Sequence, residues 1–350
     1  MRTRFSFSLC FLSIVLALTM GCSGEGNNTP EQTPKGPPPV PPRGFYMGTL
    51  PMPAEGQTFE SAYAQAAEYA EFVPVWGRPS PFYRIADDLE GDWGKVFVDQ
   101  YTYGNGMFPL VHLTFMGEGL SLASPPDMPH AALNDPLWRA AYKEAALNVV
   151  RAAQPPYLSL GNEVNRWYEK YGAESSNPNG FQHYISLYEE IYSAVKAASP
   201  QTKVFCTFAR EIVSEHRPAD LAILSMFDPA KMDLIAFTSY PYAVQSIQLP
   251  SDIPPDYYTQ AQVYMPGIPL AFTELGWPSL EALGGESAQA DFLTQATGRL
   301  THDQGVTLEL VGWAWLHDID NNDATGLLRR DGSEKLAYGV WKQISSSGGP

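Results

Sequence analysis

Short apolar runs alternate with longer segments of helical spacing along most of this 350-residue chain, and this alternation constrains the fold more than any other feature. The runs are rich in β-branched and aromatic residues, which predicts strands, and each is followed by a segment with helical periodicity. The eight predicted strands are Phe45–Leu50, Glu71–Trp76, Phe108–Phe115, Tyr157–Leu160, Lys203–Phe208, Leu234–Ser239, Pro269–Thr273 and Leu308–Trp315.

The segments between these strands carry helix boundary signals. Asn134-Asp-Pro136 precedes one helix, with proline at an early helical position, and Ser199-Pro200 ends another. Eight strands, each followed by a helix, predict a single α/β domain with the (β/α)8 TIM-barrel fold. The main alternative, an open doubly wound sheet, is disfavoured because no glycine-rich turn follows the first strand. The predicted helices are Thr58–Tyr69, Pro136–Ala153, Phe181–Ala198, Ser287–Asp303 and Ala337–Ile344.

The N-terminal segment differs in composition from the rest. A basic start and an apolar run too short for a comfortable membrane span predict that residues 1–21 are an export signal. Leu18–Cys22 resembles the lipobox of bacterial lipoproteins, which implies lipidation of Cys22; ordinary signal cleavage nearby is the alternative. Residues 22–43 contain proline clusters and predict a tether, which leaves 44–346 as the folded domain.

Charge and cysteine content agree with an exported protein. The net charge is −16, and it becomes −18 once Arg2 and Arg4 leave with the signal. Such a chain repels nucleic acid and anionic membranes, so we expect no nucleic-acid partner and membrane contact only through lipid on Cys22. Cys206 is then the one cysteine of the domain and predicts a small core residue. We expect a monomer at the cell surface or in the periplasm, or a secreted one.

Two glutamates each follow a predicted strand. Glu163 comes after the fourth strand in Tyr157–Asn165, and Glu274 comes after the seventh in Ala271–Trp277. Catalytic groups of barrel enzymes lie at the carboxyl ends of the strands, so the two acids are expected at one end of the barrel. There, a protonated carboxyl can donate to a glycosidic oxygen while an ionised one attacks the sugar carbon. Ordinary surface glutamates are the alternative.

These motifs resemble those of clan A, the superfamily of retaining (β/α)8 glycoside hydrolases, over residues of about 45 to 345 by element order. The resemblance implies that Glu163 is the acid/base, Glu274 the nucleophile, and Asn162 a contact of the sugar 2-hydroxyl. It also implies that Tyr240, at the end of strand six, donates a hydrogen bond to the nucleophile. A tryptophan at the end of strand eight should form the floor for the sugar, and alternation places both candidates, Trp313 and Trp315, on one face.

The family within the clan is less defined. The Asn-Glu context and the helix Phe181–Ala198 resemble endo-β-1,4-galactanases of glycoside hydrolase family 53, the nearest family by these motifs. In contrast, Thr273–Ser279 resembles the nucleophile motif of plant-type β-1,3-glucanases. We predict a retaining glycoside hydrolase that acts on a β-galactan, β-mannan or β-glucan type of polysaccharide or oligosaccharide. A non-catalytic carbohydrate-binding barrel and a transglycosylase with the same acids remain alternatives.

Further residues near predicted strand ends have both functional and structural interpretations. Arg78 could orient the nucleophile or contact sugar, or it could be structural, and His112 could be a cleft donor or a core histidine. Trp76 and Trp277 could stack on sugar rings or pack within loops. The acidic segment Asp318–Asp323 lacks the glycine and terminal glutamate of a calcium loop and predicts a solvated loop near the cleft rim. No metal and no cofactor are expected, because the histidines are scattered.

Overall fold

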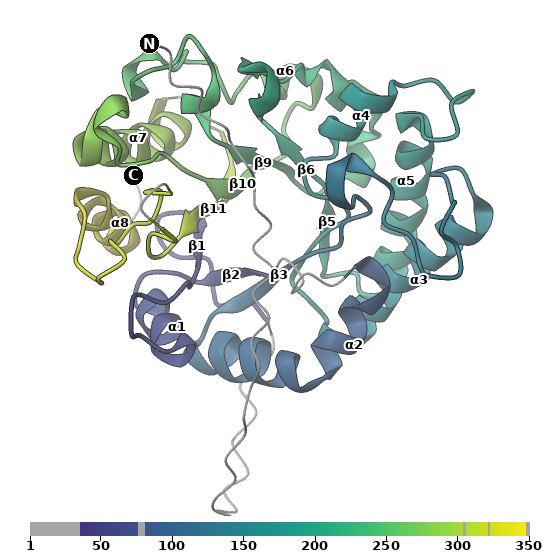
Figure 1. Cartoon of the computed structure of the whole chain (residues 1–350), viewed down its shortest axis with the longest axis horizontal. Coiled ribbons are helices and arrows are strands. Elements are labelled where there is room, and N and C mark those ends of the chain that lie inside the picture. The colour runs from purple at the N-terminus through teal and green to yellow at the C-terminus, as the bar shows by residue number, and fades with distance from the viewer. Residues whose placement is uncertain (1–35, 76–80, 304–305, 321–322, 348–350) are drawn as a thin grey trace, which may run out of the picture. The chain divides into compact units, whose positions relative to one another are not determined.

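The computed structural model describes residues 36–75, 81–303, 306–320 and 323–347. Its centre is a parallel sheet of nine strands in the order β5-β4-β3-β2-β1-β11-β10-β9-β6. The two outermost strands, β5 (Lys203–Phe205) and β6 (Thr207–Ala209), are separated only by Cys206, so they are two halves of one strand. The sheet therefore closes on itself as an eight-position TIM barrel, which confirms the predicted fold (Figure 1). The other strands are β1 (Tyr46–Leu50), β2 (Phe72–Val75), β3 (Phe108–His112), β4 (Tyr157–Ser159), β9 (Ile235–Ser239), β10 (Leu270–Leu275) and β11 (Leu308–Trp315).

Helices surround the strands as an outer ring (Figure 1). Two long helices and one strand have the predicted limits, because proline and glycine punctuate both ends of α3 and α5, and the eight residues of β11 are apolar or glycine except for Glu309. A π-helix, Arg299–Asp303, continues the chain directly after α7. The principal helices are α1 (Phe59–Ala67), α2 (Ile85–Glu90), α3 (Pro136–Ala153), α4 (Asn165–Tyr171), α5 (Phe181–Ala198), α7 (Gly285–Gly298) and α8 (Leu336–Ser346).

The prediction that a regular helix follows every strand is wrong on one side of the barrel. After β6 the chain forms a short antiparallel hairpin, β7 (Glu211–Ile212) and β8 (Arg217–Pro218), and then a 3-10 helix at Leu221–Met226. After β9 there are only 3-10 turns and the four-residue α6 (Ala261–Tyr264). Prolines are frequent in these connections, and each removes a backbone donor that a regular helix needs.

The amino-terminal end of the barrel is filled by aromatic rings. Phe108 of β3 lies 5.0 Å from Tyr46 of β1 and 5.4 Å from Tyr157 of β4 between ring centroids. The Tyr157 hydroxyl donates to Glu309 Oε1 at 2.6 Å, and Lys203 pairs with the same carboxylate. This end of a barrel serves stability, so functional groups are sought at the opposite end.

Two sequence predictions concern features outside the barrel chemistry. Cys206 is fully buried, as predicted for a core residue. Cys22, the signal and most of the tether lie outside the described residues, so lipidation remains a prediction. Within the described ranges, the helices are too short or too polar to cross a membrane.

Candidate active site

Glu163 follows β4 in a loop whose backbone is tightly constrained. A Cβ at Gly161 would lie 2.5 Å from Val164 Cγ1 and 3.0 Å from the Tyr184 hydroxyl, so only glycine fits there. Glu163 has φ +53°, a left-handed conformation that is rare for a residue with a side chain. Such a conformation costs about 1–3 kcal/mol and persists only where the surroundings enforce it, as is common at functional sites.

Asn165 fixes the start of α4 to the neighbouring strand. Its side chain donates to Ala209 O at 2.8 Å and accepts from Ala209 N at 2.8 Å. The backbone N–H of Val164 also donates to Thr207 O at 2.9 Å. These three bonds to β6 hold the two residues after Glu163, and Thr207 N donates to Gly161 O at 2.8 Å on the preceding side, which explains how its backbone conformation is maintained.

The Glu163 carboxylate is held by two donors from different elements. Thr238 of β9 donates from Oγ1 to Glu163 Oε1 at 2.9 Å, and Arg166 of α4 pairs with Oε2. The Arg166 side chain is 38% exposed and that of Glu163 is 19% exposed, so the pair reaches solvent. Thr238 and Arg166 both act here as donors, so they fix the position of the two carboxyl oxygens of Glu163.

Glu274 lies in β10 and is partly exposed, and its register partner in β9 is Thr238, the residue that donates to Glu163. Burial and then the charge of Glu163 raise the pKa of Glu274 to about 8, Asp323 adds to the rise, and a hydrogen bond from Tyr240 opposes it. Because the charge of one acid acts on the other, the structure brings the two predicted carboxylates together. They share the carboxyl ends of β4 and β10, as expected for a barrel.

Tyr240 joins Glu274 to the end of β9. Burial, and then the charge of Glu274, raise the pKa of Tyr240 well above its ordinary value, so the phenol stays protonated and donates to Glu274. A Cβ at Gly276 would lie 2.7 Å from Tyr240 Cε1, so the absence of a side chain at Gly276 leaves room for the tyrosine ring. The structure thus brings Tyr240 and Glu274 together, and the role of Tyr240 beside a nucleophile stays a prediction.

Asn162 precedes Glu163 and offers an open acceptor. Its Oδ1 is buried and has no hydrogen-bond partner among the described residues. A buried amide oxygen without a partner is costly, so it is expected to accept a hydrogen bond when a ligand enters. This position beside Glu163 is the one expected for contact with a ligand hydroxyl.

The two tryptophans of β11 differ in their surroundings. Trp313 is fully buried, donates from Nε1 to Thr325 O at 2.8 Å and packs 6.2 Å from Phe292 of α7. The pairing with β1 shifts register between Trp313 and Trp315, which interrupts the alternation behind the prediction of a shared face. Trp315 is partly exposed, so it is the better candidate of the two for contact with a ligand.

Other predicted contacts are corrected or lie outside the described residues. Trp277 is fully buried, donates to Leu283 O at 3.1 Å and packs on Phe292 at 5.3 Å, so it serves the core and not a ligand. His112 is 4% exposed, and burial lowers its pKa to about 3, which favours the core-histidine interpretation. Trp76 and Arg78 lie outside the described residues.

The acidic segment near residue 318 is more ordered than a solvated loop. Asp318 accepts from Lys335 Nζ at 2.6 Å and from Gly326 N at 2.9 Å, and the Lys335 side chain is only 1% exposed. Asp323 lies close enough to Glu274 for its charge to raise the pKa of that acid. Across the described ranges, His, Cys, Asp and Glu side chains do not form a group of three or more that could hold a metal ion.

Three polar residues of the site are not among those predicted from the sequence. Arg166 lies in the first turn of α4, three positions after Glu163, and the turn before this helix brings the two side chains together. Thr238 belongs to a strand end already noted for Tyr240. Glu211 accepts from the Tyr240 backbone N–H at 2.7 Å and is 3% exposed. It follows the fifth predicted strand, so the strand-end signal that selected Glu163 and Glu274 was present there too.

The comparisons with known proteins concern the fold. No protein-family model matches the sequence, and no curated protein matches it. Among solved structures, a GH5_18 enzyme from Streptomyces cattleya in complex with Manβ1-4GlcNAc is 15% identical, with a TM-score of 0.59 over 86% of this chain and 80% of that one. A GH5_18 enzyme from Bifidobacterium longum subsp. longum in complex with the same disaccharide is 14% identical, with a TM-score of 0.60 over 86% and 78%.

An exo-β-1,4-mannosidase from an Opitutaceae bacterium is 16% identical, with a TM-score of 0.57 over 86% of this chain and 59% of that one. At these identities the likeness establishes the fold and leaves the nearer resemblance to family 53 as a prediction. The chain is thus similar in architecture to TIM-barrel glycoside hydrolases, and its two carboxylates meet at the end of the barrel where such folds carry their sites.

Proposed function

We propose that this protein is a retaining glycoside hydrolase that cleaves a β-linked polysaccharide or oligosaccharide. The observation that carries the proposal is the pairing of Glu163 and Glu274, close enough for the charge of one to raise the pKa of the other. Two carboxyls with unlike surroundings at one site are the arrangement that glycoside cleavage requires. The neighbours bound to Manβ1-4GlcNAc, and the exo-β-1,4-mannosidase, support β-mannosides as the first glycosides to test.

Arg166 pairs with Glu163 and Thr238 donates to it, whereas burial and the charge of Glu163 raise the pKa of Glu274. We therefore propose that the two acids share one proton, which Glu274 holds in the resting site. The reactive form has that proton on Glu163 and the charge on Glu274. Interacting acids of this kind titrate as a pair.

Substrate entry is proposed to move this proton. A leaving-group oxygen beside Glu163 takes the place of the Arg166 contact, and Glu163 becomes protonated. The repulsion on Glu274 then falls, and Tyr240 stabilises the ionised Glu274 carboxylate. Glu274 attacks the anomeric carbon as the glycosidic bond breaks and Glu163 gives its proton to the leaving oxygen. Glu163 next deprotonates a water, which attacks the same carbon and releases Glu274.

The test is a panel of β-mannan, β-1,4-galactan, β-1,3-glucan and Manβ1-4GlcNAc, with product analysis. The wild-type protein should release sugar from at least one of them with retention of anomeric configuration, read by proton NMR. Glu274→Ala should abolish release, whereas Glu71→Gln, at the amino-terminal end of the barrel, should not. Hydrolysis by Glu274→Ala would refute the nucleophile assignment.

A carbohydrate-binding barrel without turnover is the second candidate. The ion pair between Arg166 and Glu163 favours it, because a paired carboxylate cannot donate a proton to a leaving group. Binding to one polysaccharide of the panel without any product would support this function. Longer oligosaccharides among the products would instead indicate transglycosylation by the same acids.

We also propose that the domain is exported and tethered to a membrane through Cys22. The proposal rests on the lipobox-like segment and the proline-rich residues that follow it. Expression of the full chain in a bacterium, followed by fractionation, tests it: Cys22→Ser should move the protein from the membrane fraction to the soluble fraction. An unchanged distribution would refute the lipid anchor.

A further inference from the structure

A third glutamate lies behind the two candidate catalytic acids. Glu211 stands just past β6 and is 3% exposed. Three donors converge on its carboxylate: the Ser239 hydroxyl at 2.9 Å, the Tyr257 hydroxyl at 2.8 Å and the Tyr240 backbone N–H at 2.7 Å. The first two bind Oε1 and the third binds Oε2. A carboxylate is the side chain that can accept all three, because it has no hydrogen to donate.

The Tyr240 N–H needs this acceptor because the strand ladder has ended. Arg210 N still donates to Thr238 O at 2.9 Å, which is the last ladder bond between this strand and β9. The carbonyl of Arg210 accepts instead from Ala219 N at 2.8 Å, within the connection that follows β6. The Glu211 carboxylate therefore takes the place of a strand carbonyl and fixes the backbone of Tyr240.

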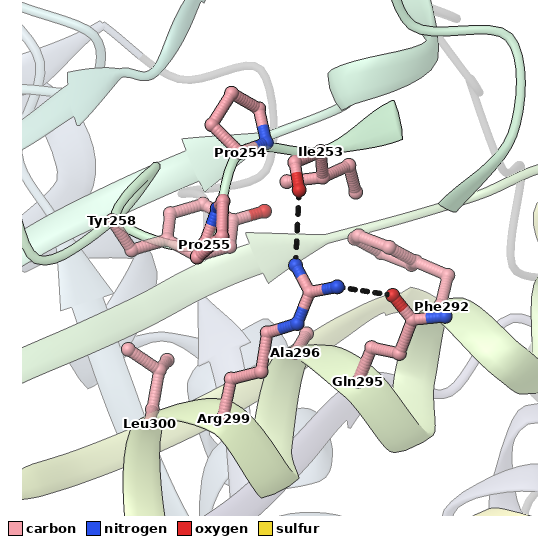
Figure 2. Close-up of a pocket in the computed structure, with 9 residues that line it drawn as sticks. All are labelled: Ile253, Pro254, Pro255, Tyr258, Phe292, Gln295, Ala296, Arg299 and Leu300. Atoms are coloured by element: carbon pink, nitrogen blue, oxygen red, sulfur yellow. Dashed lines mark hydrogen bonds between the residues drawn. The ribbon is translucent and has the colours of Figure 1, made fainter. Parts of the chain in front are cut away.

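Side chains from the end of β9 and from the connection after it enclose Glu211. Arg210 lies 3.8 Å above the Tyr257 ring and donates to Tyr257 O at 2.9 and 2.8 Å. Tyr258 shares a hydrogen bond of 2.9 Å with Ser239. On its other side, Tyr258 lines a small hollow against α7 (Figure 2). None of the candidate site residues lines this hollow.

We propose that Glu211 is a positioning residue, which holds Tyr240 so that its phenol is directed at the Glu274 carboxylate. The role rests on the proposed function of Glu274 as nucleophile. The path consists of two bonds: Glu211 to the backbone of Tyr240, and the hydroxyl of Tyr240 to Glu274. Burying a carboxylate here is unfavourable, and burial raises the pKa of Glu211 to about 7 in spite of its three donors and the nearby Arg210. A group retained at that cost is expected to serve the site.

The test is Glu211→Gln, which keeps the size and shape of the side chain. Its amide oxygen can still face the Tyr240 N–H while the NH2 group donates to the two hydroxyls, but a neutral amide oxygen accepts more weakly than a carboxylate. The weaker bond should hold Tyr240 less firmly, misdirect the phenol and lower kcat by on the order of 10-fold, with KM little changed. The pKa of Glu274, read by carbon-13 NMR of labelled carboxyls, should rise, because the Tyr240 bond that lowers it is weakened.

Two controls separate positioning from a general loss of structure. Glu71→Gln removes the charge of another carboxylate that accepts a backbone N–H, from Met47 at 2.8 Å, at the far end of the barrel. It should leave kcat and the pKa of Glu274 unchanged. In a Tyr240→Phe background, Glu211→Gln should cost little further activity, because both changes act through the same phenol.

Equal losses of activity in Glu211→Gln and Glu71→Gln would overturn the proposal. An unchanged pKa of Glu274 in Glu211→Gln would also overturn it. So would a loss of kcat from Glu211→Gln that is as large in the Tyr240→Phe background as in the wild-type protein. If Glu211→Gln does not fold, Tyr257→Phe removes one donor to the same carboxylate and should raise the pKa of Glu274 in the same direction; no change would overturn the proposal. The NMR titration needs no turnover, so it tests Glu211 even if the wild-type protein hydrolyses nothing and the proposed function fails.

Discussion

Replacing Tyr240 by phenylalanine removes one hydrogen bond from Glu274, the proposed nucleophile, and leaves the ring in place. The phenol donates to Glu274, and this bond is the one contact that lowers the pKa of that acid against burial, Glu163 and Asp323. Its loss disfavours the ionised form of Glu274. The proton that the two acids share should then stay on Glu274 for more of the time. Glu163 needs that proton in order to protonate the leaving oxygen.

The size of the effect follows from the kind of bond that is lost. Hydrogen bonds to charged groups contribute about 1.5–3 kcal/mol, and the lower figure applies because Tyr240 and Glu274 are both partly exposed. About 1.4 kcal/mol corresponds to tenfold in population or one pKa unit. Tyr240→Phe should therefore lower the plateau of kcat/KM by about tenfold. It should also move the basic limb, which reports loss of the last proton near pH 8, upward by about one pH unit.

The assay is the pH profile of kcat/KM on the best substrate of the panel, for wild type and Tyr240→Phe. A slower variant that stays active to higher pH is the expected combination. A lower plateau with an unmoved basic limb would mean that Tyr240 does not act on the charge of Glu274. A limb that moves to lower pH would contradict the sign of the interaction.

Three further predictions concern stability and binding. Because the folded pKa of Glu274 lies near 8 and its unfolded value near 4.5, wild-type stability should fall as pH rises through that window. Glu274→Gln should thus gain stability relative to wild type across the window, by at most about 5 kcal/mol, measured by urea unfolding at several pH values; a difference independent of pH would contradict this. Gly161→Ala should lose about 1–3 kcal/mol, read by the same method, because no space exists for its methyl group. Trp315→Ala should raise KM roughly tenfold, whereas Trp313→Phe should lower the melting temperature with KM unchanged; the reverse pattern would exchange their roles.

The barrel could be predicted from sequence because its signals are local. The limits of α3 are set by Asp135 as N-cap and Pro136 at the first turn, and the side-chain oxygen of Asp135 accepts from Leu137 N at 2.9 Å. β11 is apolar apart from Glu309 and Gly312, and it has the limits expected for a buried strand. The break of the fifth strand at Cys206 left no local signal, since both halves are equally apolar.

The site could be predicted only in part, because its remaining features depend on tertiary packing. Glu163 and Glu274 were identified by their place after strands, and Tyr240 by resemblance. Trp277 also follows a strand, yet its ring turns into the core against Phe292, and nothing in the local sequence distinguishes it from a ligand platform. Arg166 is close to Glu163 in sequence, but sequence does not show that the two side chains form an ion pair. That pair is seen only in the structure.

Covalent trapping of the proposed nucleophile tests the central claim most directly. A 2-deoxy-2-fluoro β-glycoside with a good leaving group, matched to the sugar that the panel identifies, should form a stable glycosyl-enzyme. Fluorine slows both steps, because both pass through an oxocarbenium-like transition state, and the good leaving group speeds only the first. Peptide mass spectrometry should then find the sugar on the peptide that contains Glu274, and Tyr240→Phe should label more slowly at the same site. Label on Glu163, or hydrolysis with inversion and no label, would contradict the account.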